Sequence, residues 1–418
     1  MSEDDVREFR RKNEMRVRGT DVPKPITQFS DIDFDKRVMR EFEERKYTGP
    51  TPIQAQGWPM ALSGRDMVGI AQTGSGKTIS FALPALIHAK KQREQRRNDE
   101  PIVPIVLVLA PTRELCLQIQ GEIDTYSRFF GLATAAVYGG VSSQPQKQAL
   151  VNGVDVLVAT PGRLIDLYEQ GFALLKRVTF LVLDEADRML DMGFEPQLRR
   201  IIPQTSEGRQ TLMWSATWPK EVRDLAQSYM TNYIQVNIGS DDLTSNARIQ
   251  QKIEFISPRE KQGCLLRILQ NVEGKVIVFC NMKRTCDDIE YALLQERMPA
   301  VAIHGDKTQA MRDRVIGDFK SGRRPILIAT DVAARGLCED YVHRIGRTAR
   351  GNTAEGTAVT FFTDMDRNNA RDLIKILNDA KQEVPKELRD MSGDGDSRRF
   401  SRYGGYNNRS RGYGGRRW

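Results

Sequence analysis

Cysteine and histidine are scarce in this sequence, which limits the kinds of site that it can form. It has five cysteines, an odd number without a C-x-x-C pair, and three histidines. A structural zinc site or a disulfide framework is therefore not expected. So few cysteines favour a reducing compartment, and we expect the protein in the nucleus, the cytoplasm or both.

Long hydrophobic runs are absent as well. No segment approaches the roughly 18 apolar residues of a membrane span, and the richest run, PIVPIVLVLAP, is interrupted by prolines. The first residues, MSEDDVREFRRK, are charged and have no apolar signal core. The sequence thus predicts neither a membrane span nor secretion.

The body of the chain lacks a strong charge of either sign. The net charge is +8, and residues 391–418 contribute most of it through seven arginines against two aspartates. Nucleic-acid affinity of the body must therefore come from placed groups rather than bulk charge. The last segment, SRRFSRYGGYNNRSRGYGGRRW, interleaves arginines with aromatics and predicts a disordered tail that binds nucleic acid by stacking. An inert soluble extension is the alternative.

Apolar, β-branched runs alternate with amphipathic patterns over most of the chain. The runs that predict strands lie at 66–71, 105–110, 155–160, 180–184 and 211–216, and then at 275–280, 300–304, 325–330 and 356–362. This alternation predicts an α/β fold in which parallel sheets are covered by helices on both faces.

The same pattern predicts how the chain is divided. It pauses at the polar stretch IGSDDLTSNARIQQ and then restarts, as expected for a linker between two domains. We expect an N-terminal extension at 1–24, a first domain at 25–238, a linker at 239–249, a second domain at 250–388 and a tail at 389–418.

The segment AQTGSGKT, residues 71–78, has the pattern of a phosphate-binding loop. It follows an expected strand and precedes a helical pattern, which is the context that such a loop requires. Gly74 and Gly76 allow backbone N–H groups to face phosphates, and Lys77 would reach the β- and γ-phosphates. Thr78 would help to hold Mg²⁺. Ala71 stands where the generic pattern begins with glycine, and a purely structural turn is the alternative.

An acidic pair adds the second half of a hydrolytic site. In LVLDEAD, Asp184 and Glu185 end an expected buried strand, at the edge where ligands of open α/β sheets bind. One carboxylate can hold Mg²⁺ while the other orients the attacking water. Acidic charges at a helix N-terminus are the alternative interpretation. Together the loop and the pair indicate a nucleoside triphosphatase.

Further segments complete an ordered set of nine motifs. With AQTGSGKT and DEAD, they are KYTGPTPIQ (46–54), PTRELCLQ (111–118), GG (139–140), TPGR (160–163), SAT (215–217), QAMR (309–312) and HRIGRTAR (343–350). The chain resembles, over roughly residues 20–385, the DEAD-box ATP-dependent RNA helicases of superfamily 2, in particular nuclear members with arginine- and glycine-rich tails. This resemblance implies two tandem RecA-like domains, ATP and Mg²⁺ as cofactors, and single-stranded or locally duplex RNA and ribonucleoproteins as partners.

The resemblance also implies roles for single residues. Gln54 would read the adenine edge, Tyr47 would offer a stacking face, and Phe29 lies upstream of both. The implied nucleotide site is Phe29, Tyr47, Gln54, Ala71, Gln72, Thr73, Gly74, Ser75, Gly76, Lys77 and Thr78, with Thr78 and Asp184 as metal ligands. The implied catalytic set is Lys77, Asp184, Glu185, Ser215, Thr217, Arg344 and Arg347. The implied RNA-backbone contacts are Pro111, Thr112, Arg113, Gly140, Thr160, Gly162, Arg163 and Thr330.

Arginines cluster near the end of the second domain, and a solvated basic helix face is the alternative to a site. Arg344 and Arg347 lie about one helical turn apart and would approach the γ-phosphate from the second domain. The implied mechanism is closure, in which ATP and single-stranded RNA bridge the two domains. The domains then bend one RNA strand, and hydrolysis releases it.

The sequence departs from the family between two motifs. Only Leu337 and Cys338 separate Gly336 from EDYVHRIGR, where the family has a further strand that would need roughly 15 residues with its connections. Cys338 also stands where the family has an aspartate at the ribose. We therefore hypothesise an intact first domain and a second domain that lacks a strand. The alternative function is that of a catalytically impaired ATP- and RNA-binding protein, and a DNA helicase is a weaker alternative. The gap itself could equally come from a genuine variant or from a misjoined gene model.

Overall fold

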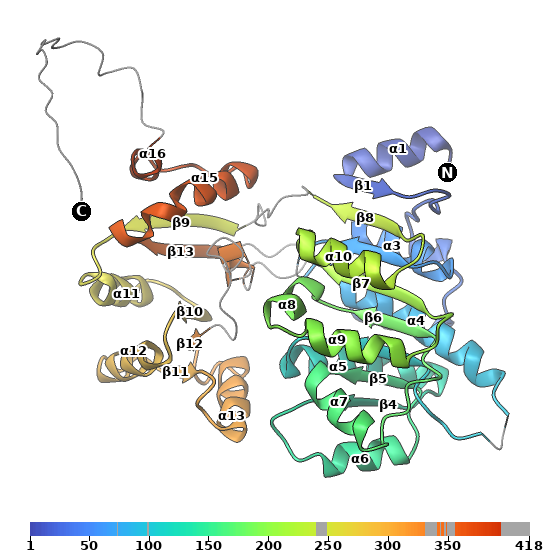
Figure 1. The fold of residues 1–418 in the computed structure, drawn as a ribbon. Helices are drawn as coiled ribbons and strands as arrows, with labels where there is room; N and C mark the ends of the chain where they lie inside the picture. The colour runs from blue at the N-terminus through green and yellow to red at the C-terminus, as the bar shows by residue number, and fades with distance from the viewer. Residues whose placement is uncertain are drawn as a thin grey trace, which may run out of the picture.

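The computed structural model describes residues 1–72, 74–97, 100–239, 249–330, 341–342, 344–346, 348 and 356–393. These residues form two successive α/β units (Figure 1). No described helix is long and apolar enough to cross a membrane.

The first unit is built on an eight-stranded sheet in the order β1-β8-β2-β7-β6-β3-β5-β4. Its strands are β1 (Met15–Arg18), β2 (Met67–Ile70), β3 (Val106–Leu109), β4 (Thr134–Val137), β5 (Val156–Ala159), β6 (Phe180–Leu183), β7 (Gln210–Ser215) and β8 (Ile234–Ile238). Neighbouring strands are parallel except for β1, which pairs antiparallel with β8. Because β1 belongs to this sheet, the first unit includes residues before the predicted boundary at 25.

Helices cover both faces of this sheet (Figure 1). They are α1 (Glu3–Lys12), α2 (Lys36–Glu44), α3 (Pro52–Leu62), α4 (Lys77–Glu94), α5 (Arg113–Phe130), α6 (Gln144–Val151), α7 (Pro161–Glu169), α8 (Ala186–Asp191), α9 (Glu195–Ile201) and α10 (Lys220–Tyr229), with 3-10 turns η1 (Phe29–Asp31) and η2 (Ile202–Gln204). Alternate strand residues such as Val108 and Leu109 enter two separate cores. Strands buried on both faces explain the continuous apolar runs in the sequence.

The second unit has two separate parallel sheets among the described residues. Their strands are β9 (Ile249–Phe255), β10 (Val276–Cys280), β11 (Ala300–Ile303), β12 (Ile326–Thr330) and β13 (Gly356–Phe362). One sheet has the order β10-β12-β11, and the other pairs β13 with β9. The helices are α11 (Lys261–Gln270), α12 (Lys283–Gln295), α13 (Gln309–Lys320), α15 (Ala370–Asp379) and α16 (Lys386–Ser392), with the 3-10 turn η3 (Asp364–Asn369).

The division into two sheets bears on the predicted loss of a strand. No described strand joins β10 to β13, and each sheet has its own hydrophobic core. The joint itself, Leu337–Cys338, lies outside the described residues, as do most of the predicted linker and residues 394–418. The helix α16 continues beyond residue 388, so the predicted tail begins with helical residues.

Candidate nucleotide and RNA site

The predicted motifs of the first unit gather at one edge of its sheet. The strands β2, β3, β5, β6 and β7 are parallel, and a motif follows the carboxyl end of each. Parallel strands place their carboxyl ends along the same edge, where open α/β sheets bind ligands. The fold therefore brings together segments that are up to about 145 residues apart in the sequence.

The phosphate-binding loop connects β2 to α4. Gly74 and Gly76 have φ angles of 80° and 96°, in the left-handed region that favours glycine. A Cβ atom on Gly76 would lie 2.6 Å from Nε2 of Gln54, so a side chain does not fit there. The Ser75 hydroxyl donates to the carbonyl of Gln72 at 2.8 Å and shapes the turn. Thr73 lies outside the described residues.

The lysine of this loop is held inside the site. Lys77 is the first residue of α4 and is only 7% exposed. Its Nζ atom donates to the carbonyl of Ala71 at 2.7 Å and to that of Ser215 at 3.4 Å. The N–H group of Ala71 in turn donates to the carbonyl of Ser215 at 3.1 Å. The ammonium group is thus oriented by the ends of two neighbouring strands, β2 and β7.

The acidic pair follows β6, as predicted. Asp184 is buried, and this burial raises the pKa of its carboxyl to about 7, with Glu185 and Asp187 adding to the rise and Lys77 opposing it. Glu185 adopts a left-handed φ of 52°, which is unusual for a residue with a side chain. Such backbone strain is often found at functional sites.

The donor set fits a magnesium ion. Mg²⁺ is usually held by one or two carboxylates together with substrate phosphates and water. The hydroxyl of Thr78 and the carboxylate of Asp184 are oxygen ligands of this kind at one sheet edge. No group of three or more His, Cys, Asp or Glu residues that could hold a metal occurs in the described part of the chain.

The last aspartate of the DEAD segment, Asp187, is a site residue that the motifs had not singled out. Asp187 is buried, and its Oδ2 accepts from the N–H groups of Ala216 and Thr217 at 3.2 and 3.1 Å and from the Thr217 hydroxyl at 2.9 Å. It thereby links the acidic pair to the segment 215–217. The Ser215 hydroxyl is buried without a hydrogen-bond partner in the described structure. The sequence feature that could have identified Asp187 is its place in the same short motif as Asp184 and Glu185.

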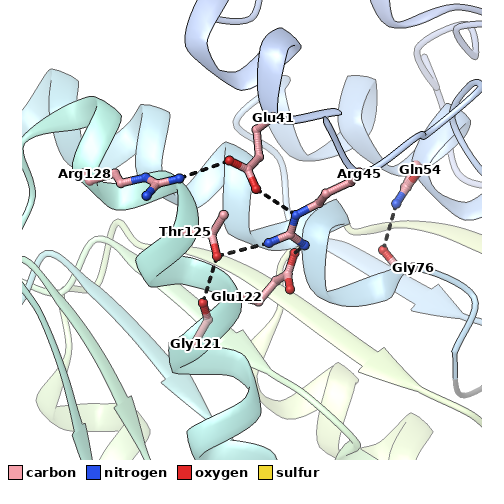
Figure 2. A network of polar contacts seen from close by, with 8 residues as sticks. All are labelled: Glu41, Arg45, Gln54, Gly76, Gly121, Glu122, Thr125 and Arg128. Atoms are coloured by element: carbon pink, nitrogen blue, oxygen red, sulfur yellow. Dashed lines mark hydrogen bonds and ion pairs between the residues drawn. The ribbon is translucent and has the colours of Figure 1, made fainter. Parts of the chain in front are cut away.

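The predicted adenine-reading residues lie beside the phosphate loop. Gln54 is buried in α3, accepts from the Thr51 N–H at 2.9 Å and donates to the Gly76 carbonyl at 3.3 Å (Figure 2). Its amide has capacity for one more bond at each end. Tyr47 is 40% exposed, and Phe29 packs against the aromatic core, with its ring centroid 4.6 Å from that of Phe42.

The RNA-contact candidates of β3 lie at the start of α5. Pro111 is buried, and Thr112 caps the helix by accepting from Leu115 N–H at 3.3 Å. Arg113 is largely enclosed. Its guanidinium lies 4.9 Å from the centroid of the Tyr138 ring and forms a 2.9 Å ion pair with Asp313 on α13 of the second unit.

The other RNA-contact candidates are spread over neighbouring strand ends. Gly140 has a φ of 81°, and Gly162 has open space where a side chain would stand. Thr160 is the N-cap residue of α7. Arg163 donates to the carbonyl of Val141 at 2.9 Å and to Gln146 Oε1 at 3.2 Å, while Thr330 ends β12 in the second unit. The arrangement brings the first-unit candidates to the edge that carries the phosphate loop.

Of the two predicted arginines of the second unit, the structure describes one. Arg344 donates to Oδ1 of Asn281 at 3.4 Å, and its guanidinium lies 5.8 Å from the centroid of the Phe279 ring. It therefore lies at the carboxyl end of β10. Arg347 lies outside the described residues. A joint approach of both arginines to the phosphate loop stays a prediction.

Comparisons with known proteins define the class to which this site belongs. Residues 51–225 match the DEAD/DEAH box helicase family, and residues 260–337 match the helicase conserved C-terminal domain. The second match ends at Leu337, beside the short joint. The chain belongs to the DEAD-box helicases, a family of superfamily 2.

Individual relatives cover almost the whole chain. The ATP-dependent RNA helicase DBP2 of Encephalitozoon cuniculi is 59% identical, over 97% of this chain and 85% of the relative, and that of Pyricularia oryzae is 50% identical over 98% and 78%. The first alignment extends over 424 residues, more than the 418 of this chain, so the relative has residues that this chain lacks.

Solved structures agree with this assignment. The yeast DEAD-box splicing factor Prp28 aligns with a TM-score of 0.55 at 32% identity, over 96% of this chain and 97% of its own. Prp28 of Chaetomium thermophilum bound to ADP aligns with a TM-score of 0.53 at 34% identity, over 93% and 97%. The predicted class is confirmed: an ATP-hydrolysing RNA helicase with tandem RecA-like domains. None of these findings favours the catalytically impaired alternative.

Proposed function

We propose that this chain binds single-stranded RNA across its two units and couples Mg²⁺-dependent ATP hydrolysis to local duplex unwinding or ribonucleoprotein remodelling. The observation that carries the proposal is the hydrogen-bonded connection of three motifs at one sheet edge. Lys77 contacts the end of β7, and Asp187 holds the segment 215–217 that follows it. A change at the nucleotide can therefore reach the backbone around Thr217 through these two contacts.

The residues divide the hydrolytic work according to their chemistry. Lys77 binds the β- and γ-phosphates, while Thr78 and Asp184 would hold Mg²⁺, which neutralises phosphate charge when bound. Glu185 orients the attacking water, and its carboxylate accepts from Nη1 of Arg188 at 3.4 Å. Arg344 and Arg347 stabilise the charge that develops on the γ-phosphate after closure.

The RNA would be gripped by its sugar–phosphate backbone. The candidates are helix N-termini, three threonine hydroxyls and two arginines, groups that bind phosphate and ribose without distinguishing bases. Little sequence specificity follows, so the choice of RNA target depends on other partners, among them ribonucleoproteins. We propose the nucleus, the cytoplasm or both as its location.

The test is the rate of ATP hydrolysis by the full 418-residue chain, with and without single-stranded RNA. We expect a clear increase with RNA that is lost in the Glu185→Gln variant, because the attacking water is then no longer oriented. Single-stranded DNA of the same length is the matched control. An unchanged rate with RNA, in a protein that still binds ATP, would contradict the coupling and support the impaired alternative. Equal stimulation by DNA would instead revive a DNA helicase.

A further inference from the structure

We propose that Arg45 is a positioning residue that presents Tyr47 to the nucleotide base and thereby sets the preference for adenine. This inference rests on the proposed function of the nucleotide site. Arg45 follows α2 directly, and Tyr47 is the second residue after it. Neither the motif pattern nor the composition of the sequence singles out Arg45.

The guanidinium of Arg45 is fixed in several directions at once (Figure 2). Its Nε donates to Oε1 of Glu41 at 2.9 Å, and its Nη1 donates to Oε1 of Glu122 at 2.7 Å. Its Nη2 donates to the hydroxyl of Thr125 at 3.1 Å. The guanidinium also lies 5.6 Å from the centroid of the Tyr126 ring. A planar group with contacts on this many sides has little freedom to turn.

These contacts join the end of α2 to α5. Glu41 belongs to α2, whereas Glu122, Thr125 and Tyr126 all belong to α5. Because α5 packs into the hydrophobic core through residues such as Ile119 and Ile123, it is a firm support. The position of the chain that leaves α2 is therefore set by Arg45 against this support.

That chain leads directly to the exposed tyrosine. Lys46 turns it with a left-handed φ of 57°, and the Tyr47 N–H donates to the carbonyl of Phe42 at 2.9 Å. The Tyr47 ring packs beside the Phe42 ring, with 5.8 Å between the centroids, and the residue as a whole is 40% exposed. Tyr47 thus depends for its position on the end of α2, which Arg45 holds.

The second adenine-reading residue is held independently. Gln54 is fixed by Thr51 and Gly76, within α3 and the phosphate loop. A stacking ring accepts any base, whereas an amide distinguishes base edges by its donor and acceptor. A preference for adenine therefore requires that the Tyr47 ring hold the base where its edge meets the fixed Gln54 amide. A displaced Tyr47 would weaken this match without altering the catalytic groups near Asp184.

The test compares Arg45→Met with Arg128→Met. Arg128 donates to the same Glu41 at 3.0 Å, but its side chain is 62% exposed and it is distant in sequence from Tyr47. Affinities for ATP and UTP are measured by calorimetry on the full chain without RNA. For Arg45→Met we expect ATP binding to weaken roughly tenfold, because the adenine edge no longer meets the Gln54 amide, while UTP, which makes no such match, weakens less. For Arg128→Met we expect both affinities to stay within about twofold of the parent.

Three outcomes would overturn the proposal. These are an unchanged ATP-to-UTP ratio in Arg45→Met, an equal loss in both variants, or a loss in maximal hydrolysis rate with unchanged ATP affinity. If Arg45→Met does not fold, Thr125→Val removes one contact of Arg45 and is expected to shift the ratio in the same direction by a smaller amount. The test measures nucleotide affinity and not hydrolysis. A chain that fails to hydrolyse ATP with RNA would therefore refute the proposed function, while the role of Arg45 could still be tested.

Discussion

Replacement of Asp313 by asparagine should strengthen the binding of single-stranded RNA in the absence of ATP. Arg113, a candidate for RNA-phosphate contact, forms a 2.9 Å ion pair with Asp313 on α13. The Arg113 side chain is 14% exposed and that of Asp313 is 54% exposed. A phosphate that binds the Arg113 guanidinium must displace the carboxylate, so the ion pair and the RNA compete for the same group.

The size of the effect follows from the exposure of the pair. Ion pairs with one solvent-exposed partner contribute about 0.2–1 kcal/mol. Its removal should therefore lower the Kd for RNA by a factor of about 1.4 to 5, since about 1.4 kcal/mol corresponds to tenfold. Arg113→Gln should act in the opposite direction, because it removes the phosphate contact itself. It should also reduce the salt dependence of binding by about one phosphate contact.

Fluorescence anisotropy of a labelled oligouridine, titrated with the full chain, measures this difference. The matched control is Asp306→Asn, which removes the same charge from the second unit but from a carboxylate that pairs with Lys283 at 2.6 Å. An equal gain in both variants would show that only net charge matters. A weaker affinity in Asp313→Asn would refute the competition.

Four other substitutions test the site and its support. In the ligand-free protein, Asp184→Asn should raise the melting temperature, and the gain should grow from about pH 4 to about pH 7 and then level off. The pKa of this carboxyl is raised to about 7 in the folded state. The parent protein therefore loses stability as pH rises above the unfolded pKa of Asp184, whereas the asparagine variant does not. Scanning fluorimetry at several pH values measures this difference. Gly69→Ala should lower the free energy of unfolding by about 1–3 kcal/mol, because its Cβ would collide with the Trp214 indole. In contrast, Gly121→Ala has open space on α5 and should raise it by up to about 1 kcal/mol in urea unfolding. Asp187→Asn should lower RNA-stimulated hydrolysis roughly tenfold with ATP affinity preserved, since it weakens the contact to segment 215–217; stimulation at the parent level would contradict this role.

Much of the first unit could be predicted from the sequence because its strands are buried on both faces. Such strands are continuous apolar runs, and β2, β3, β5, β6 and β7 were all predicted. The edge strands β1 and β4 were not. Their sequences, MRVR and TAAV, alternate or are small, because edge strands are covered less completely. The strands β8 and β9 were not predicted either, and they lie at the two ends of the polar stretch that was interpreted as a linker.

The identities of the site residues followed from motifs, but their partners did not. Nothing local in the sequence indicates that Gln54 would bind the carbonyl of Gly76, or that Arg113 would meet Asp313 two hundred residues later. Such contacts depend on the packing of helices that are distant in the chain. The contact between Phe29 and Phe42 is another that the sequence did not indicate.

Backbone amides in the two sheets of the second unit should be less protected from hydrogen exchange than those in the sheet of the first unit. Within the described residues, β10 pairs only with β12, and β13 pairs only with β9. The apolar residues Val276–Phe279 of β10 are only half-buried, whereas β6 is buried throughout. An edge strand leaves half of its N–H groups outside the ladder, and these groups exchange without unfolding of the sheet.

Hydrogen exchange detected by mass spectrometry can therefore locate the open edges. We expect the amides of β10 and β13 to exchange faster than those of β12, and β12 faster than β6, because β12 has neighbours on both sides in a smaller sheet. A peptide of the first unit such as β3 is the internal control. If β10 were as protected as β12, a strand would have to pair with its free edge in solution, and the hypothesis of a missing strand would fail. If the difference is observed and RNA still stimulates hydrolysis, the second unit performs its part of the cycle without a continuous sheet.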